Sequence, residues 1–228
     1  FVLAFKLVFS GDKDLIEIIV LSLRVSLTAV SFAVVIGVPL GAVLATSRFY
    51  GRGLVLVLLN ALMGLPPVVV GLIVYLQLSR SGPMGSFGLL YTPTAMIIAQ
   101  TILITPIIAA LTRQTIEDLW DEYSEYLKSL DSKKIDTMQT LLWDARFSLV
   151  IIVLAGFGRA IAEVGAVMIV GGNIDNITRV MTTAIALETS KGNLSIALGL
   201  GITLLFIAFA VNGVSQFISS VLSKRAML

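Results

Sequence analysis

Arg159 and Glu163 are the residues of this 228-residue chain whose type and position most suggest chemistry. They lie four positions apart in an otherwise apolar stretch, so on a helix they share one face and can form an ion pair. Pairing lowers the cost of placing either charge in a bilayer, and an ionisable residue at membrane depth is by default a functional candidate. Two interpretations stay open. Arg159 could line a pathway through the membrane and attract a passing anion while Glu163 holds it, or the pair could only fix helix packing.

The adjacent prolines Pro66 and Pro67, followed by Val68, are a second candidate. Each proline removes a backbone donor, so a helix must break or kink there. Discontinuous helices at membrane depth tend to line a cavity. The break therefore predicts either a constriction that opens and closes or a local packing feature. Together with Arg159 and Glu163, these three residues are our candidates for a pathway or gate.

The composition excludes several other chemistries. The chain has no histidine and no cysteine, so the usual neutral-pH proton relay, the commonest metal ligand and thiolate chemistry are missing. We expect no cofactor and no metal. A net charge of +2 gives no electrostatic support for binding nucleic acid. An enzyme at membrane depth would need a nucleophile with a base, or paired carboxylates, and Glu163 is the only acidic residue expected there. The chain is therefore not expected to be an enzyme.

The elements that must position these residues are membrane helices. Hydrophobic residues make up 57% of the chain and charged residues 13%, against about a quarter charged in soluble domains. Several charge-free runs reach the roughly 20 residues that span a bilayer core. The sequence predicts an all-α polytopic membrane protein, a single transmembrane domain over residues 1–228. Its five spans are expected at about 15–46, 53–78, 94–112, 147–171 and 194–222, with a polar loop from about 174 to 193.

Five spans place the two termini on opposite sides of the membrane. With the C-terminus inside, nine lysines and arginines fall in the inner segments and five in the outer ones. The excess of positive charge on cytoplasmic segments favours that orientation. We therefore expect the N-terminus outside and the C-terminus in the cytoplasm.

Residues 113–146 form a polar block between the third and fourth spans, and they hold most of the acidic residues of the chain. Apolar and aromatic side chains recur there at spacings of three and four, as on an amphipathic helix: Ile116, Leu119, Trp120, Tyr123, Tyr126, Leu127 and Leu130. After Asp131 a second helical stretch follows, from about residue 135 to 143. The pattern predicts two short helices that lie across the membrane face and bind a soluble partner.

This block resembles the cytoplasmic loop of the membrane subunits of ATP-binding-cassette (ABC) importers. That loop begins Glu-Ala-Ala, has a glycine four residues later and ends Ile-x-Leu-Pro. Here the register falls on Glu125, Tyr126 and Leu127, then Asp131, then residues 141–144, so the glutamate and Leu141 match while the alanines, glycine and proline are replaced. The resemblance implies that ATPase subunits dock here, on Tyr123, Glu125, Tyr126, Leu127, Leu130 and Asp131.

A wider resemblance covers nearly the whole chain from residue 15 onward. Residues 157–174 (FGRAIAEVGAVMIVGGNI), 178–185 (TRVMTTAI), 187–192 (LETSKG) and 65–71 (LPPVVVG) are similar to the tungstate permeases and their molybdate and sulfate relatives. The resemblance implies the type I ABC importer permease fold and a homodimer in a bacterial or archaeal plasma membrane. It also implies two cytoplasmic ATPase subunits and an external oxyanion-binding protein as partners.

A different class of transporter stays open as the alternative. A secondary transporter or channel for an inorganic anion would act without an ATPase. It would be expected to carry coupling carboxylates or an inverted repeat in the membrane. The chain has no Gly-x-x-x-x-Gly-Lys-Ser/Thr phosphate loop, so ATP-driven transport would need the ATPase of a partner.

Overall fold

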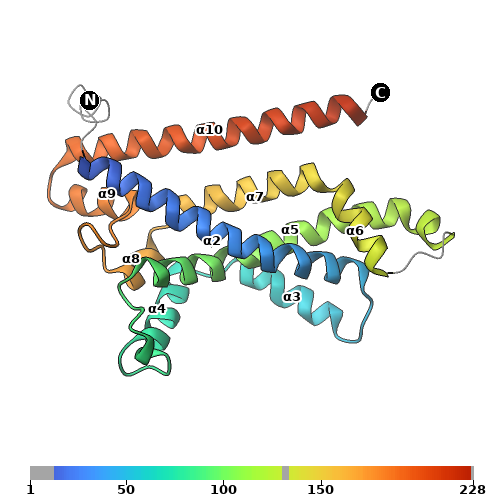
Figure 1. Ribbon diagram of the computed structural model, residues 1–228, viewed down its shortest axis with the longest axis horizontal. Coiled ribbons are helices and arrows are strands. Elements are labelled where there is room, and N and C mark those ends of the chain that lie inside the picture. Colours follow the sequence, from blue (N-terminus) through green and yellow to red (C-terminus); the bar gives the residue numbers. More distant parts are fainter. Residues whose placement is uncertain (1–12, 130–133, 227–228) are drawn as a thin grey trace.

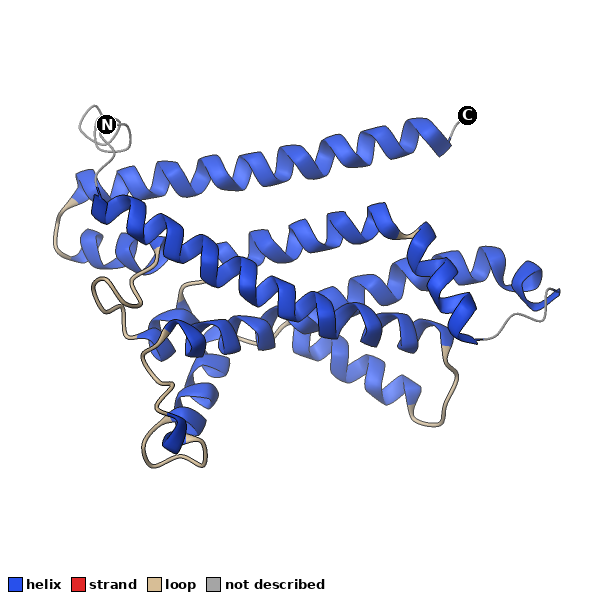
Figure 2. Cartoon of the chain, viewed as in Figure 1, coloured by secondary structure: helices blue, strands red, loops and turns tan. Residues whose placement is uncertain are grey.

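The computed structural model describes residues 13–129 and 134–226, and every regular element in these ranges is helical. Figures 1 and 2 show the helices running mostly along the long axis of the molecule. In chain order they are α2 (Lys13–Thr46), α3 (Arg52–Met63), α4 (Pro67–Leu78), the 3-10 helix η1 (Gly85–Phe87), α5 (Pro93–Ser129), α6 (Lys134–Asp144), α7 (Arg146–Ile161), α8 (Gly165–Gly171), α9 (Met181–Ser190) and α10 (Leu194–Ala226). The predicted all-α architecture is confirmed.

Three helices are long and apolar enough to cross a bilayer alone: α2, α5 and α10. Two further spans are possible only as bent pairs, α3 with α4 at an angle of 99° and α6 with α7 at 71°. The described residues thus hold three to five candidate spans. From the sequence we expected one span over residues 147–171. In the structure α7 ends at Ile161 and α8 is a separate short helix.

Helices α2 and α5 pack along each other and form the centre of the fold. Gly37 and Gly41 on α2 allow this close approach. A Cβ atom on Gly41 would lie 2.5 Å from the carbonyl oxygen of Ala109 on α5, and one on Gly37 would lie 3.0 Å from that of Thr105. The contact at Gly41 leaves no room for a side chain and the one at Gly37 is tight, so the two backbones lie in direct contact. The pair is surrounded by α7, α8, α3 and α4.

We expected a separate short helix to begin near residue 113, but this segment is part of α5. Helix α5 continues without a break from Pro93 to Ser129, and of the two expected short helices only the second is separate, as α6. The physical reason is composition, because no glycine or proline occurs between residues 107 and 129 to end the helix. The apolar part and the charged part of α5 are therefore one continuous rod.

We expected a polar loop between residues 174 and 193, and this prediction is wrong for residues 181–190. The segment contains α9, which buries Met181, Thr182, Thr183 and Ala184. Threonine counts as polar in a sequence, but here the hydroxyl groups of Thr182 and Thr183 donate hydrogen bonds to the carbonyl oxygens of Glu163 and Val180, so both residues can be buried. In Figure 1, α9 lies beside the beginnings of α2 and α10, at the end of the molecule opposite α6.

Candidate functional site

The interruption between α7 and α8 carries Glu163. Only Ala162, Glu163 and Val164 separate the two helices. The Glu163 side chain is 4% exposed, and its Oε2 lies 2.5 Å from Nη1 of Arg159, the basic residue of the last turn of α7. Its Oε1 accepts a hydrogen bond of 3.3 Å from the backbone amide of Ala166 in the first turn of α8. One carboxylate therefore joins the end of α7 to the start of α8.

Side chains from two other helices hold the backbone of this interruption. Gln100 of α5, 3% exposed, donates from Nε2 to the carbonyl oxygen of Ala160 at 3.1 Å. Thr182 of α9 donates its hydroxyl to the carbonyl oxygen of Glu163 at 2.8 Å. Breaking a helix frees carbonyl groups that must find new donors away from water. Gln100 and Thr182 are those donors, so the break is a specified feature of the fold.

The second interruption lies between α3 and α4, at the two prolines. Pro66 has φ −63° and ψ 123°, and Pro67 is the first residue of α4. A residue before proline is kept out of the helical region by the proline ring, and Pro67 tolerates its place because the first amide of a helix needs no partner. The resulting bend of 99° turns α4 away from the axis of α3.

The two interruptions meet. A Cβ atom on Gly165, the first residue of α8, would lie 2.9 Å from Cγ2 of Val68 and 3.7 Å from Oε1 of Glu163. A Cβ atom on Gly71 of α4 would lie 2.8 Å from the Cα of Ala166. Val68 and the Glu163 carboxylate, 95 positions apart in sequence, thus lie against the same glycine.

The predicted gate residues are therefore gathered on two touching helix breaks. Arg159 is the most accessible charged group there, with 39% of its side chain exposed, and Val68 is 55% exposed. A guanidinium that is paired on one side and open on the other can offer donors to an anion while its charge is balanced. Whether these residues line a translocation pathway stays a prediction.

The predicted docking residues are divided by the structure. Tyr123, Glu125, Tyr126 and Leu127 lie in the last turns of α5, whereas Leu130 and Asp131 fall outside the described residues. Glu125 and Tyr126 are exposed, the latter at 67%. Tyr123 instead packs against a small apolar cluster of Ala45, Ile116, Leu141 and Ala145, which ties α5 to α6 and α2.

Sequence reasoning missed Gln100 and Thr182. Gln100 carried a usable signal, because it is the only amide side chain in the charge-free run from residue 81 to 112, and a polar group in a span faces protein or water. Thr182 carried none, since it stood in a segment interpreted as a loop.

At the far end of α9, Glu188 fixes the corner between α9 and α10. Its Oε2 accepts a hydrogen bond of 2.7 Å from the Asn193 amide, and its Oε1 one of 2.9 Å from the Lys191 ammonium. These bonds, Asn193 first, hold the pKa of Glu188 below its ordinary value although its burial acts in the opposite direction. The carboxylate is thus kept ionised where the chain enters its last span.

Replacing both Pro66 and Pro67 by alanine is expected to reduce the 99° bend. Each proline opposes a continuous helix by about 3 kcal/mol, and with alanine in both places α3 and α4 can extend toward each other. Because the chain lacks cysteine, spin labels on introduced cysteines at Leu58 and Ile73 report this angle directly. The distance between the labels should lengthen. An unchanged distance distribution would show that packing of α4 on α8, not the prolines, sets the bend.

Two helix breaks that meet at the buried Glu163 carboxylate, together with a membrane helix that continues into a charged segment, are features expected of a membrane permease subunit. The family model for the "Binding-protein-dependent transport system inner membrane component" matches residues 37–227. The chain belongs to this family, the permease subunits of ABC importers.

Among its relatives, the chain is 44% identical over 211 residues to the tungstate uptake system permease protein TupB of Peptoclostridium acidaminophilum, covering 92% of each sequence. It is 38% identical over 213 residues to TupB of Campylobacter jejuni, covering 93% of this chain and 89% of that protein. The solved structure of the MetNI methionine ABC transporter matches with a TM-score of 0.76 at 15% identity, covering 93% of this chain and 98% of that one. The last comparison shows a shared fold.

Proposed function

We propose that this chain forms the membrane pathway through which an ABC importer takes up tungstate, with molybdate as the next candidate substrate. The observation that carries the proposal is the identity of 44% with a tungstate uptake permease over almost the whole chain. More distant relatives include a molybdenum permease, at 25% identity, and sulfate permeases. Tungstate, molybdate and sulfate are all tetrahedral oxyanions.

The proposed assembly contains two copies of this chain, two cytoplasmic ATPase subunits and an oxyanion-binding protein on the outer side. The chain sits in a bacterial or archaeal plasma membrane with its N-terminus outside and its C-terminus in the cytoplasm. In that orientation the α5 to α6 end of the molecule lies in the cytoplasm. The α9 end then faces the binding protein.

At the two touching breaks, Val68 with Pro66 and Pro67 forms the constriction, and Arg159 faces the passing dianion. The exposure of Arg159 supports this role, and its pairing with Glu163 supplies the balance that a conduit needs. An unpaired arginine in a low-dielectric passage would hold a dianion too tightly to release it. With Glu163 attached, the site presents hydrogen-bond donors and little net charge.

ATPase docking is expected to require the exposed end of α5. Replacing Glu125 and Leu127 by lysine should abolish co-purification of the ATPase in detergent, because two new positive charges change a surface whose neighbouring acids are Asp121 and Glu122. Asp175→Lys, at the α9 end, is the matched control and should leave the complex intact. Retention of the ATPase by the double variant would contradict docking at this place.

Uptake into vesicles tests the whole proposal. Vesicles that contain this chain and the ATPase, supplied with the binding protein and ATP, should accumulate tungstate, and unlabelled molybdate and sulfate should compete according to the affinity of the binding protein. Vesicles with this chain alone should accumulate none. Accumulation by the chain alone would overturn the importer and favour a secondary transporter or channel.

A further inference from the structure

Three helices meet in one charged cluster at the α5 to α6 end of the molecule. Oε1 of Glu117 on α5 accepts a hydrogen bond from Nη2 of Arg52, the first residue of α3, and Oε2 accepts one from Nη1 of Arg113, one turn earlier on α5. Nε of Arg52 also donates to the carbonyl oxygen of Leu44, near the end of α2, at 2.9 Å. We call Arg52, Arg113 and Glu117 the Glu117 clamp.

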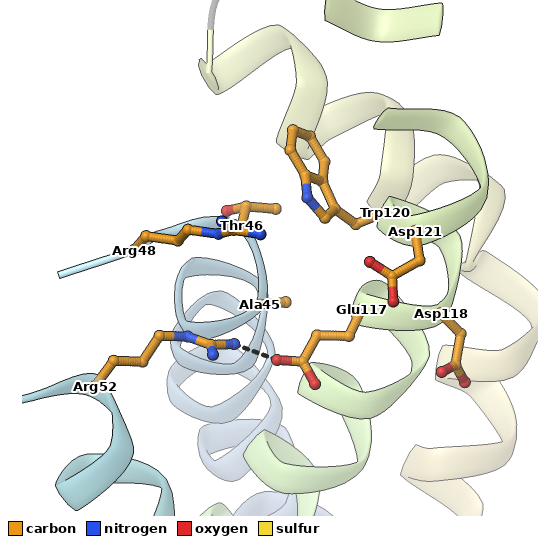
Figure 3. A pocket seen from close by; sticks show the side chains of 8 residues that line it. All are labelled: Ala45, Thr46, Arg48, Arg52, Glu117, Asp118, Trp120 and Asp121. Atoms are coloured by element: carbon orange, nitrogen blue, oxygen red, sulfur yellow. Dashed lines mark hydrogen bonds and ion pairs between the residues drawn. The ribbon is translucent and has the colours of Figure 1, made fainter. Parts of the chain in front are cut away.

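The clamp is partly shielded from water. The side chains of Arg52, Glu117 and Arg113 are 27%, 26% and 20% exposed. Figure 3 shows Arg52 reaching across from α3 to Glu117 on the wall of an open cavity of about 530 Å³. Charge pairs in such a setting are weakened by solvent less than pairs on an open surface.

Apart from the clamp, helix α3 buries few side chains against α2 and α5. Direct backbone contact at Gly37 and Gly41 packs α2 closely against α5. In contrast, α3 buries a single residue, Leu59, which packs together with the partly buried Leu56 against Leu44, Ala109 and Ala110. The first residue of α3, Arg52, is attached to the α2 and α5 pair by the clamp.

The other end of α3 leads to the candidate gate. It passes through the bend of 99° into α4, which packs on α8 at Gly71 and Ala166, beside the break that holds Glu163. A displacement of the charged part of α5 can therefore reach the Pro66 and Pro67 break along α3, provided that the first turn of α3 moves with α5.

We propose that Glu117 is a positioning residue for ATP-driven transport, which makes α3 follow α5 so that movement of the docked end of α5 opens or closes the break at Pro66. This inference rests on the proposed function. In this role Glu117 contacts neither the ATPase nor the transported anion and acts through Arg52. Its substitution should change how much transport each ATP produces rather than whether the subunits assemble.

The first test is Glu117→Gln in the complete complex of permease, ATPase and binding protein in vesicles. The amide keeps the size of the side chain and removes its charge. Tungstate taken up per ATP hydrolysed should fall by about tenfold, a usual size for a coupling free energy, while co-purification of the ATPase stays normal. Asp118→Asn is the matched control, because Asp118 is an exposed neighbour that points away from Arg52 in Figure 3. It should leave the ratio unchanged.

The second test restores the connection by other means. The chain has no cysteine, so Arg52→Cys with Glu117→Cys, in cysteine-free partners, can be joined by a short bifunctional thiol reagent. Without the reagent the double variant should be uncoupled, and cross-linking should recover uptake per ATP. If cross-linking abolishes uptake, α3 must move against α5 and the inference is wrong.

The outcomes separate this inference from the proposed function. Normal uptake per ATP in both the native complex and Glu117→Gln overturns the role of the clamp alone. Absence of ATP-dependent uptake in the native complex overturns the importer and the clamp together.

Discussion

Replacing Glu163 by alanine is expected to lower the free energy of unfolding by about 3 kcal/mol, the lower end of the range for breaking a buried ion pair. The lower end applies because the Arg159 partner is partly exposed. The substitution leaves a guanidinium without its carboxylate at membrane depth and removes the acceptor for the Ala166 amide. The measurement is an SDS unfolding titration in mixed micelles. Glu163→Gln should lose less, since the amide oxygen can still accept one of these hydrogen bonds.

The Arg179 and Asp175 pair provides a control with the same spacing. These residues are also four positions apart, at 2.7 Å, but the Asp175 side chain is 66% exposed. Asp175→Ala should therefore cost no more than about 1 kcal/mol, as exposed ion pairs generally do. Equal losses in Glu163→Ala and Asp175→Ala would show that burial adds nothing to the Arg159 and Glu163 pair.

Gly41→Ala is expected to be strongly destabilising although it adds only a single methyl group. The new Cβ would lie 2.5 Å from the Ala109 carbonyl oxygen, 2.8 Å from Cβ of Thr112 and 2.9 Å from the Arg113 amide nitrogen. Two of these three atoms are backbone and cannot turn aside, so α2 and α5 must separate. Overpacking of this kind costs about 3 kcal/mol at the upper end of its usual range. Thermal unfolding in detergent should show a markedly lower midpoint.

Gly53→Ala is the matched control for Gly41→Ala. Gly53 lies in the first turn of α3 with no atom within 4 Å of its would-be Cβ, and its φ lies outside the positive range. Alanine there should be neutral or stabilise the helix by about 0.5–1 kcal/mol. A similar loss at both glycines would mean that α2 and α5 are not in direct backbone contact.

The sequence predicted the helical membrane architecture because that rests on local composition. Long apolar runs, adjacent prolines and a charged block each have a direct structural meaning. The pairing of Arg159 with Glu163 also follows from spacing alone. The break between α7 and α8 does not, since Gly165 is its only local sign and donors from Gln100 and Thr182, distant in sequence, are needed to hold it.

The clamp and α9 show the same limit in other ways. Arg52 and Glu117 are 65 positions apart, and their pairing depends on how the turn after α2 returns α3 toward α5. In α9, threonines that look polar are buried because their surroundings supply partners, as in the hydrogen bond from the Thr182 hydroxyl to the Glu163 carbonyl oxygen, 19 positions away. Both features depend on tertiary contacts that no local pattern contains.

The unbroken course of α5 has a geometric consequence. Its 37 residues at 1.5 Å each extend about 55 Å, whereas the hydrocarbon core is about 30 Å thick, so roughly 25 Å of the helix extends beyond the hydrocarbon core. A tilt of about ten degrees moves a tip at that distance by about 4 Å. A displacement of a few ångströms outside the bilayer would therefore correspond to a small rotation of the part of α5 inside it.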